Sequence, residues 1–292
     1  MGSSINGLSF ILILDNMKEL FKMGGKTDYG KLTPIISATG IILIIFLWWL
    51  EAKLGIIPTK LFPGPIEVVR SFGVLVSDYN LVANSWFSIK MNLLAYIWAI
   101  CISIPLGLVI AIYPLPNLCI GKYINAIRFL PLPATTALFI SAGGLTYGTK
   151  LMFLVVALVI FILPEVCNKV NSLQNRHGSD YIYLETIKTL GASPWQMFRW
   201  VYWPYVTSGV SGSIRSLAAL SWSYVTISEL IYKDGEVNGI GALISTSFRQ
   251  AHIPEAWAGL FLIIIIGVIQ DWVFKMLEEF IFPYMYNKKR IL

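Results

Sequence analysis

The sequence predicts an all-α integral membrane protein with six transmembrane helices. The chain has 292 residues, of which 56% are hydrophobic and only 13% charged, and its mean hydropathy is +0.69. A soluble globular domain has a less apolar composition. Apolar segments long enough to cross a bilayer recur along the chain and are separated by short polar or basic stretches.

One transmembrane domain is expected over residues 34–280. Its predicted spans are roughly 34–52, 88–113, 126–145, 150–168, 206–231 and 256–280. Pro131 and Pro133 fall in the third span, so we expect it to begin as a broken or interfacial helix. No internal repeat or second domain is visible in the sequence.

Two tails and two long loops complete the predicted organisation. Residues 1–33 form an N-terminal tail that could lie on the membrane surface as an amphipathic helix, and residues 281–292 form a C-terminal tail. The loop 54–87 contains a proline-rich turn and then Ile66, Val69, Phe72 and Val76 at steps of three or four, which predicts a short surface helix. The loop 170–205 is polar and rich in aromatic residues.

The basic residues set the orientation. If the N-terminus is cytoplasmic, 14 of the 22 Lys and Arg residues fall in cytoplasmic segments, seven fall in external ones and Arg215 lies within a span. The positive-inside rule then places both tails and the loop 170–205 in the cytoplasm, and the loop 54–87 outside. This topology also explains the net charge of +6, so no nucleic-acid partner is predicted.

The sequence offers no catalytic or metal-binding constellation. The three cysteines and two histidines are too far apart for a disulfide framework or a zinc site. Gly24-Gly25-Lys26-Thr27 lacks the first glycine of a P-loop, because Leu20 stands there. We therefore predict neither an enzyme nor a cofactor bound by this chain.

The segment Ser179 to Pro204 is predicted to be two short helices joined at a glycine. Ser179 or Asp180 can cap the first helix, and Gly191 stands where a left-handed residue would end it. Tyr183, Ile187 and Leu190 share one face of that helix.

The second helix has the better-marked start. Ser193 is a good N-cap, Pro194 suits the first helical position, and Gln196 completes a capping box. Pro204 is expected to stop the run. From the residues alone two interpretations stay open: an interfacial hairpin resting on lipid headgroups through its tryptophans, or an elbow gripped by a partner.

The fifth span is unusually small and polar, and it carries ionisable residues. Arg215, Ser216, Ser223 and Glu229 are candidates for a translocation path. Arg215 could equally be a structural ion pair between helices, and Glu229 lies near the outer end, where water could satisfy it. In the sixth span, Asp271 could pair with Lys275, and Glu278 and Glu279 are expected to be solvated at headgroup level.

The spacing of the loop carries a family resemblance. Glu185, Gly191, Val201 and Trp203-Pro204 follow the pattern E-A-A-x3-G-x9-I-x-L-P. The segment therefore resembles the cytoplasmic coupling loop of permease subunits in binding-protein-dependent ABC importers. Thr186 and Ile187 replace the two alanines, so a dedicated ATPase partner is expected.

The resemblance covers most of residues 60–280 and is to the nitrate, sulfonate, taurine and bicarbonate branch. The motifs that carry it are I-P-L-G-L at 104–108, T-L-G-A-S-x-W-Q-x-F at 189–198 and G-x-x-x-D at 267–271. In addition, R-S-L-A-A-L-S-W at 215–222 resembles the family segment L-R-x-A-L-G-L-A-W. It implies a type I importer permease of MetI-like architecture in the bacterial plasma (inner) membrane. The solute would be a small anion of that branch.

The resemblance also implies partners and roles. Two permease copies, as a homodimer, would form the pathway within the lipid bilayer, with two separate ABC ATPase subunits that bind ATP and Mg²⁺ and an extracytoplasmic solute-binding protein. ATP-driven closure would rock the spans between inward-open and outward-open states. The coupling residues would be Glu185, Leu190, Gly191, Ala192, Ser193, Trp195, Gln196, Phe198 and Pro204.

Two rival interpretations remain. A secondary carrier or channel would explain the spans and the charged residues inside them, but not the spacing of the elbow, and no inverted repeat supports it. A membrane-embedded enzyme has no convergent acid, base, nucleophile or metal ligands to support it.

Overall fold

The computed structural model describes residues 32–230 and 239–286, and those residues are helical with no strand. Contacts divide the chain into two units, residues 1–66 and 67–292. The predicted N-terminal tail and the end of the C-terminal tail lie outside the described residues. The fold class predicted from composition and hydropathy, an all-helical membrane protein, is confirmed.

The first unit contains one apolar helix, α2 (Leu32–Leu54), which ends at Gly55 in the left-handed conformation (φ +65°). Isoleucine, leucine and phenylalanine side chains between Ile41 and Leu47 are exposed within the unit, as expected for a helix surrounded by lipid. The indole of Trp48 donates a hydrogen bond to the carbonyl of Pro63 (3.0 Å), which ties the end of α2 to the proline-rich turn that follows.

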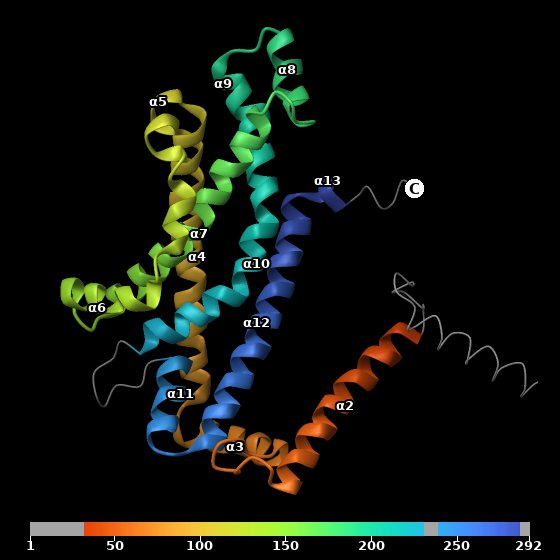
Figure 1. Cartoon of the computed structure of the whole chain (residues 1–292), viewed down its shortest axis with the longest axis vertical. Helices are drawn as coiled ribbons and strands as arrows, with labels where there is room; N and C mark the ends of the chain where they lie inside the picture. The colour runs from red at the N-terminus through yellow and green to blue at the C-terminus, as the bar shows by residue number, and fades with distance from the viewer. Residues whose placement is uncertain (1–31, 231–238, 287–292) are drawn as a thin grey trace, which may run out of the picture. The chain divides into compact units, whose positions relative to one another are not determined.

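The second unit is a bundle in which α4, α7, α10 and α12 run beside one another, with the other elements at its two ends (Figure 1). Its elements are α3 (Pro65–Asp78), α4 (Leu81–Ile112), α5 (Pro114–Pro116), η1 (Asn117–Gly121), η2 (Ile124–Phe129), α6 (Leu132–Gly143), α7 (Tyr147–Gln174), α8 (Tyr181–Thr189), α9 (Pro194–Met197), η3 (Phe198–Tyr202), α10 (Trp203–Glu229), α11 (Ile240–Arg249), α12 (Ile253–Ile281) and α13 (Pro283–Tyr286).

Four of the described helices, α2, α4, α7 and α12, are long and apolar enough to cross a membrane. A fifth crossing is possible if Pro114–Phe129 and Leu132–Gly143 count as one span, although they meet at 100°. α6 consequently runs across the direction of α4 and α7 (Figure 1). The break falls at Pro131 and Pro133, as the sequence predicted, because proline removes helical N–H donors and disfavours helix in the residue before it.

α10 has 27 residues, but its serines, glycines and Arg215 leave it less apolar than those four helices. The predicted count of six spans is therefore not reached by length and composition alone.

The core of the bundle depends on close approach between α4 and α7. A Cβ atom added to Gly107 would lie 2.6 Å from Cγ1 of Val166, so the glycine lets the two backbones come together. Met91, Leu154, Leu158 and Val166 are among the buried residues around this contact. Large and small side chains interdigitate there as in other protein interiors.

We expect Gly107→Ala to destabilise the bundle by about 1–3 kcal/mol, because the added methyl group overpacks the α4–α7 contact. The measurement is thermal unfolding in detergent. Val166→Ala in the same chain should restore part of the loss, because it removes Cγ1 at 2.6 Å but leaves Cβ at 2.8 Å. The same substitution at Gly73 of α3, where nothing lies within 4 Å, is the control and should cost nothing. Equal effects at both glycines would contradict this packing argument.

The short helix predicted after the proline-rich turn is present as α3. Ile66, Val69 and Val76 of its predicted apolar face are exposed, and the opposite face carries the buried residues Val68, Ser71 and Leu75. The exposed valine and isoleucine suit contact with lipid headgroups and acyl chains.

Candidate functional site

The elbow is built from α8, a left-handed glycine and α9, as the sequence predicted. Gly191 has φ +75°, and its N–H bonds to the carbonyl of Lys188 (3.0 Å), which closes α8. The Ser193 hydroxyl accepts from the N–H of Gln196 (3.4 Å), and the Gln196 side chain accepts from the N–H of Ser193 (2.7 Å). The capping box is therefore confirmed.

Two details of the elbow differ from the prediction. Asp180 occupies the N-cap position of α8, but its side chain does not cap; the carboxylate instead accepts hydrogen bonds from the hydroxyls of Tyr205 (2.5 Å) and Ser179 (3.3 Å). Pro204 does not stop the helix, because it lies in the first turn of α10.

The continuation through Pro204 has a local cause. The π turn η3 comes directly before α10, and in it the N–H of Trp203 bonds to the carbonyl of Phe198, five residues back. This wider turn relieves the clash that a proline ring makes in a regular helix. α9, η3 and α10 thus follow one another without a break from Pro194 to Glu229.

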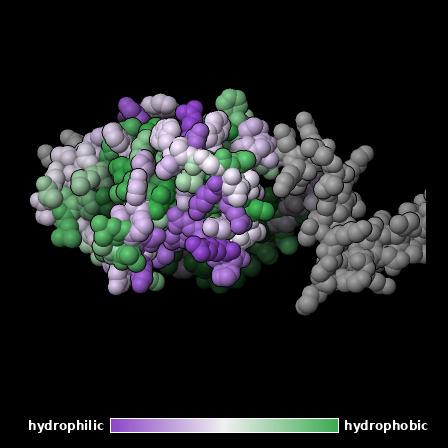
Figure 2. All heavy atoms as spheres, turned by 90° about the horizontal axis from the view of Figure 1, so that it is seen from above, coloured by the Kyte–Doolittle hydropathy of each residue, from purple (hydrophilic) through white to green (hydrophobic). Residues whose placement is uncertain are grey.

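Most of the predicted coupling residues are accessible on the elbow. Glu185, Gly191, Ser193, Trp195 and Gln196 are exposed. Leu190 is also exposed, at 79%, whereas Ala192, Phe198 and Pro204 are partly buried. Figure 2 looks onto this end of the molecule, where hydrophilic side chains gather among apolar ones.

The elbow is anchored to the bundle by a few contacts. Leu184 is the buried residue of α8 (1% exposed), whereas Leu190 is exposed and the ring of Tyr183 lies 6.4 Å from that of Tyr205 in α10. Gln174 at the end of α7 donates to the hydroxyl of Tyr202 (3.1 Å), and the rings of Trp195 and Phe198 stack 5.5 Å apart. An apolar groove of about 520 Å³ separates α9 and η3 from the end of α4.

A second groove, of about 880 Å³, lies between α10 and α12. Three of the four predicted path residues, Arg215, Ser216 and Ser223, line it together with Asp271. The Arg215 guanidinium bridges two carboxylates of α12, Nε to Asp271 (3.1 Å) and NH1 to Glu278 (3.4 Å). Arg215 is thus an interhelical ion pair that also borders the groove.

The partners of α12 differ from those predicted. Asp271 forms its ion pair with Arg215 of α10, and not with Lys275 of its own helix as expected. Glu278 is 7% exposed and also accepts from the hydroxyl of Ser211 (2.7 Å), so the prediction that it is solvated is wrong. Glu279 is exposed, as expected.

Glu229 does not line the groove. Its side chain is fully buried at the other end of α10, where Ser88 donates to it (2.5 Å) and the N–H of Gly241 donates to it (2.6 Å). The expectation that water satisfies this carboxylate is therefore wrong.

Sequence reasoning missed a polar layer inside the bundle. The Gln270 carbonyl of α12 accepts from Asn92 of α4 (3.1 Å) and from the indole of Trp222 of α10 (2.8 Å). All three residues are buried. A signal was present, because an uncharged amide inside an apolar span is costly unless it pairs with another helix.

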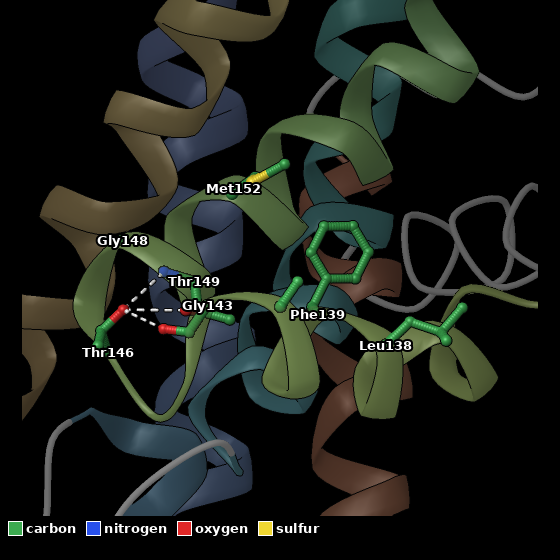
Figure 3. Close-up of a pocket in the computed structure, with 8 residues that line it drawn as sticks. Leu138, Phe139, Gly143, Thr146, Gly148, Thr149 and Met152 are labelled. Atoms are coloured by element: carbon green, nitrogen blue, oxygen red, sulfur yellow. Dashed lines mark hydrogen bonds between the residues drawn. The ribbon is translucent and has the colours of Figure 1, made fainter.

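Another hollow, of about 410 Å³, lies between α6 and the start of α7. Figure 3 shows the Thr146 and Thr149 hydroxyls there pointing toward one another. They bond to each other (2.9 Å), and Thr146 caps α7 by accepting from the N–H of Thr149 (3.2 Å). Their hydrogen bonding thus serves the turn into α7. Within the described ranges, no three His, Cys, Asp or Glu residues are grouped to hold a metal ion.

Comparisons with known proteins agree with this architecture. No protein-family model matches the chain. A probable ABC transporter permease protein of Brucella melitensis biotype 1 is 22% identical over 241 residues, covering 81% of this chain and 93% of that protein. The taurine transport system permease protein TauC of Escherichia coli (strain K12) is 20% identical over 254 residues, covering 85% and 89% respectively.

The fold has a solved counterpart. A chain of the MetNI methionine ABC transporter, solved in inward-facing conformations, superposes with a TM-score of 0.53 at 18% identity, over 69% of this chain and 94% of that chain. Relatives named as permeases thus align along most of the sequence, and a permease fold matches the described helices. The chain is therefore similar in sequence to ABC transporter permeases over most of its length, and it shares the fold of a membrane chain of an ABC importer.

Proposed function

We propose that this protein is the permease subunit of an ABC importer, which forms the membrane pathway for a small solute and is driven through its elbow by a separate ATPase. The observation that carries the proposal is the uninterrupted helical path from α9 through η3 into α10. A force applied to the exposed elbow passes along that path to the residues that border the groove. A rigid helix transmits such a displacement to its packed neighbours better than a loop would.

The chemistry of the elbow suits docking into a cleft of another protein. It presents an acid at Glu185, a large apolar side chain at Leu190 and an indole at Trp195 (65% exposed), held by two short helices of which the second has a capping box. Aromatic and leucine side chains displayed on a preorganised frame are favourable binding anchors. Glu185, Leu190, Gly191, Ala192, Ser193, Trp195, Gln196, Phe198 and Pro204 make up the proposed coupling surface.

The proposed assembly contains two permease copies, two ATPase subunits that bind ATP and Mg²⁺, and an extracytoplasmic solute-binding protein. It lies in the bacterial plasma membrane with both permease termini in the cytoplasm. The count of basic residues supports this orientation, because 14 of 22 then lie in cytoplasmic segments. No cofactor is assigned to the permease itself.

For the solute we propose a small sulfonate or related anion. The naming of one relative as a taurine permease supports this class, and Arg215 borders the groove. Part of the guanidinium is already paired with Asp271 and Glu278, so the binding protein is the better place for selection of the solute.

The first test is co-purification with an ATPase. We expect the wild-type permease to retain an ABC ATPase in detergent and Glu185→Arg to reduce the retained amount about tenfold, because the reversed charge faces the partner cleft. Quantitative mass spectrometry of the purified complex measures this. Glu279→Arg, the same change at an exposed position outside the elbow, is the control and should bind normally. A wild-type permease that transports its solute without any ATPase would be a secondary carrier, and the proposal would fail.

A further inference from the structure

The end of the bundle opposite the elbow holds a buried carboxylate that joins three helices. Glu229, the last residue of α10, is fully buried. One carboxylate oxygen accepts from the Ser88 hydroxyl of α4 (2.5 Å), and the other accepts from the N–H of Gly241 in α11 (2.6 Å). Lys150 of α7 is a further buried ionisable residue of this bundle, at 4% exposed.

The first turn of α11 is bound to α4 by two further hydrogen bonds. Ser88 accepts from the N–H of Ile240 (2.9 Å), and the side chain of Asn84 accepts from the N–H of Gly239 (3.0 Å). These N–H groups are unsatisfied at the start of any helix, and here side chains of other helices satisfy them. Because Ser88 serves both Glu229 and Ile240, the bonds form one network.

The backbone of α11 fits closely around the carboxylate. Gly239 has φ +104°, and a Cβ atom there would overlap the carboxyl group of Glu229. A Cβ atom at Gly241 would lie 2.7 Å from the backbone of Thr226. No side chain can be accommodated at either position without moving α11 away from α10.

The far end of α11 is tied to the same part of α4. The Tyr79 hydroxyl, just before α4, lies 3.0 Å from Nδ1 of His252 and 3.3 Å from the side-chain oxygen of Gln250. The side chain of Asn84 in turn donates to the carbonyl of Tyr79 (2.9 Å). α11 is thus held at both ends against the beginning of α4, and Glu229 is the charged group in that attachment.

We propose that Glu229 is the latch that holds α11 closed over the end of the bundle opposite the elbow, and that the latch opens during transport. α10 carries the elbow at one end and Glu229 at the other, about 40 Å apart at 1.5 Å per residue. Displacement of α10 at the elbow therefore acts on the latch directly. Leaving a buried carboxylate without its donors is costly, so loss of these bonds favours release of the side chain into water.

Glu229 is accordingly a positioning residue, and the first experiment needs only the permease in detergent. Hydrogen–deuterium exchange is measured over residues 239–249. Glu229→Gln keeps the side-chain volume, and Ser88→Ala removes one hydroxyl; either should speed exchange at 239–241 by about 10- to 100-fold. Ser85→Ala is the matched control, because among residues 32–230 and 239–286 the Ser85 hydroxyl bonds to its own helix at Leu81 (2.7 Å), and exchange should not change.

The second experiment uses the complete importer in proteoliposomes and rests on the proposed function. In the wild type, exchange over 239–249 should be about tenfold faster in a vanadate-trapped state than without nucleotide. The Glu229→Gln variant should already show the faster exchange without nucleotide. It should also hydrolyse several times more ATP per solute imported, because the detachment of α11 would no longer require movement of the elbow.

Either experiment can overturn the inference. If Glu229→Gln and Ser88→Ala exchange like Ser85→Ala, the bonds do not hold α11. If exchange is the same in both nucleotide states, or Glu229→Gln couples as tightly as the wild type, the attachment is static. Failure of the chain to assemble with an ATPase would contradict the proposed function and not the latch, because the first measurement needs no ATPase.

Discussion

Replacing Gly191 by proline is expected to abolish ATP-driven uptake while the protein remains in the membrane. Gly191 has φ +75°, which proline cannot adopt because its ring holds φ near −65°. The substitution also removes the N–H that bonds to Lys188. α8 and α9 would then meet at a different angle, and the coupling surface would no longer match its cleft. Uptake of solute into proteoliposomes measures the loss.

Alanine and asparagine at position 191 separate the effect of backbone conformation from the effect of an added side chain. A Cβ atom at Gly191 has nothing within 4 Å, so alanine costs only the left-handed backbone strain, about 1–2 kcal/mol, and should reduce uptake without abolishing it. Asparagine adopts this conformation more readily and should lie close to the wild type. Full uptake by the proline variant would refute the coupling assignment.

Arg215→Met is expected to destabilise the permease by about 2–3 kcal/mol, because the change leaves the buried Glu278 carboxylate without its counter-charge. Methionine keeps much of the side-chain length, so lost packing is a minor part of the effect. Asp271, which is half exposed, can be solvated after the change, but Glu278 cannot. The measurement is the thermal midpoint in detergent, together with uptake by the reconstituted importer.

A second substitution tests the cause. Glu278→Gln combined with Arg215→Met removes the uncompensated charge and should restore most of the stability, a coupling expected of groups in direct contact. Arg199→Met, at an exposed position on the elbow, should leave the thermal midpoint unchanged. If the double variant is no more stable than Arg215→Met alone, Arg215 does not stabilise the protein through its ion pair with Glu278.

The elbow could be predicted from the sequence because its determinants are local. Ser193 and Gln196 bond within four residues, and Gly191 suits the left-handed position through its own lack of a side chain. The same holds for α2, α4, α7 and α12, whose apolar length is enough to mark them as membrane helices. These parts of the fold could be predicted without knowing their tertiary contacts.

The wrong predictions share one cause: contacts and turns that cannot be inferred from the local sequence. Ser179 or Asp180 was predicted to cap α8, but the Asp180 carboxylate bonds instead to Tyr205, 25 residues later. Asp271 was assigned to Lys275 one turn away, but it pairs with Arg215 on another helix. Pro204 was expected to end a helix, yet the π turn before it lets the helix continue. In each case a tertiary contact or a neighbouring turn replaced the local rule.

The sequence by itself determined that this protein is helical, lies in a membrane and carries a capped elbow with the spacing of an importer permease. Only the tertiary structure decided the partners of the ionisable residues of α10. Arg215 forms ion pairs with two carboxylates of α12, and Glu229 accepts hydrogen bonds from Ser88 of α4 and from the first turn of α11. The physical reason is the distance along the chain between the residues that interact. Capping and hydropathy act within a few residues, whereas a buried charge must find its partner across the packed bundle, and packing alone selects which helix supplies it.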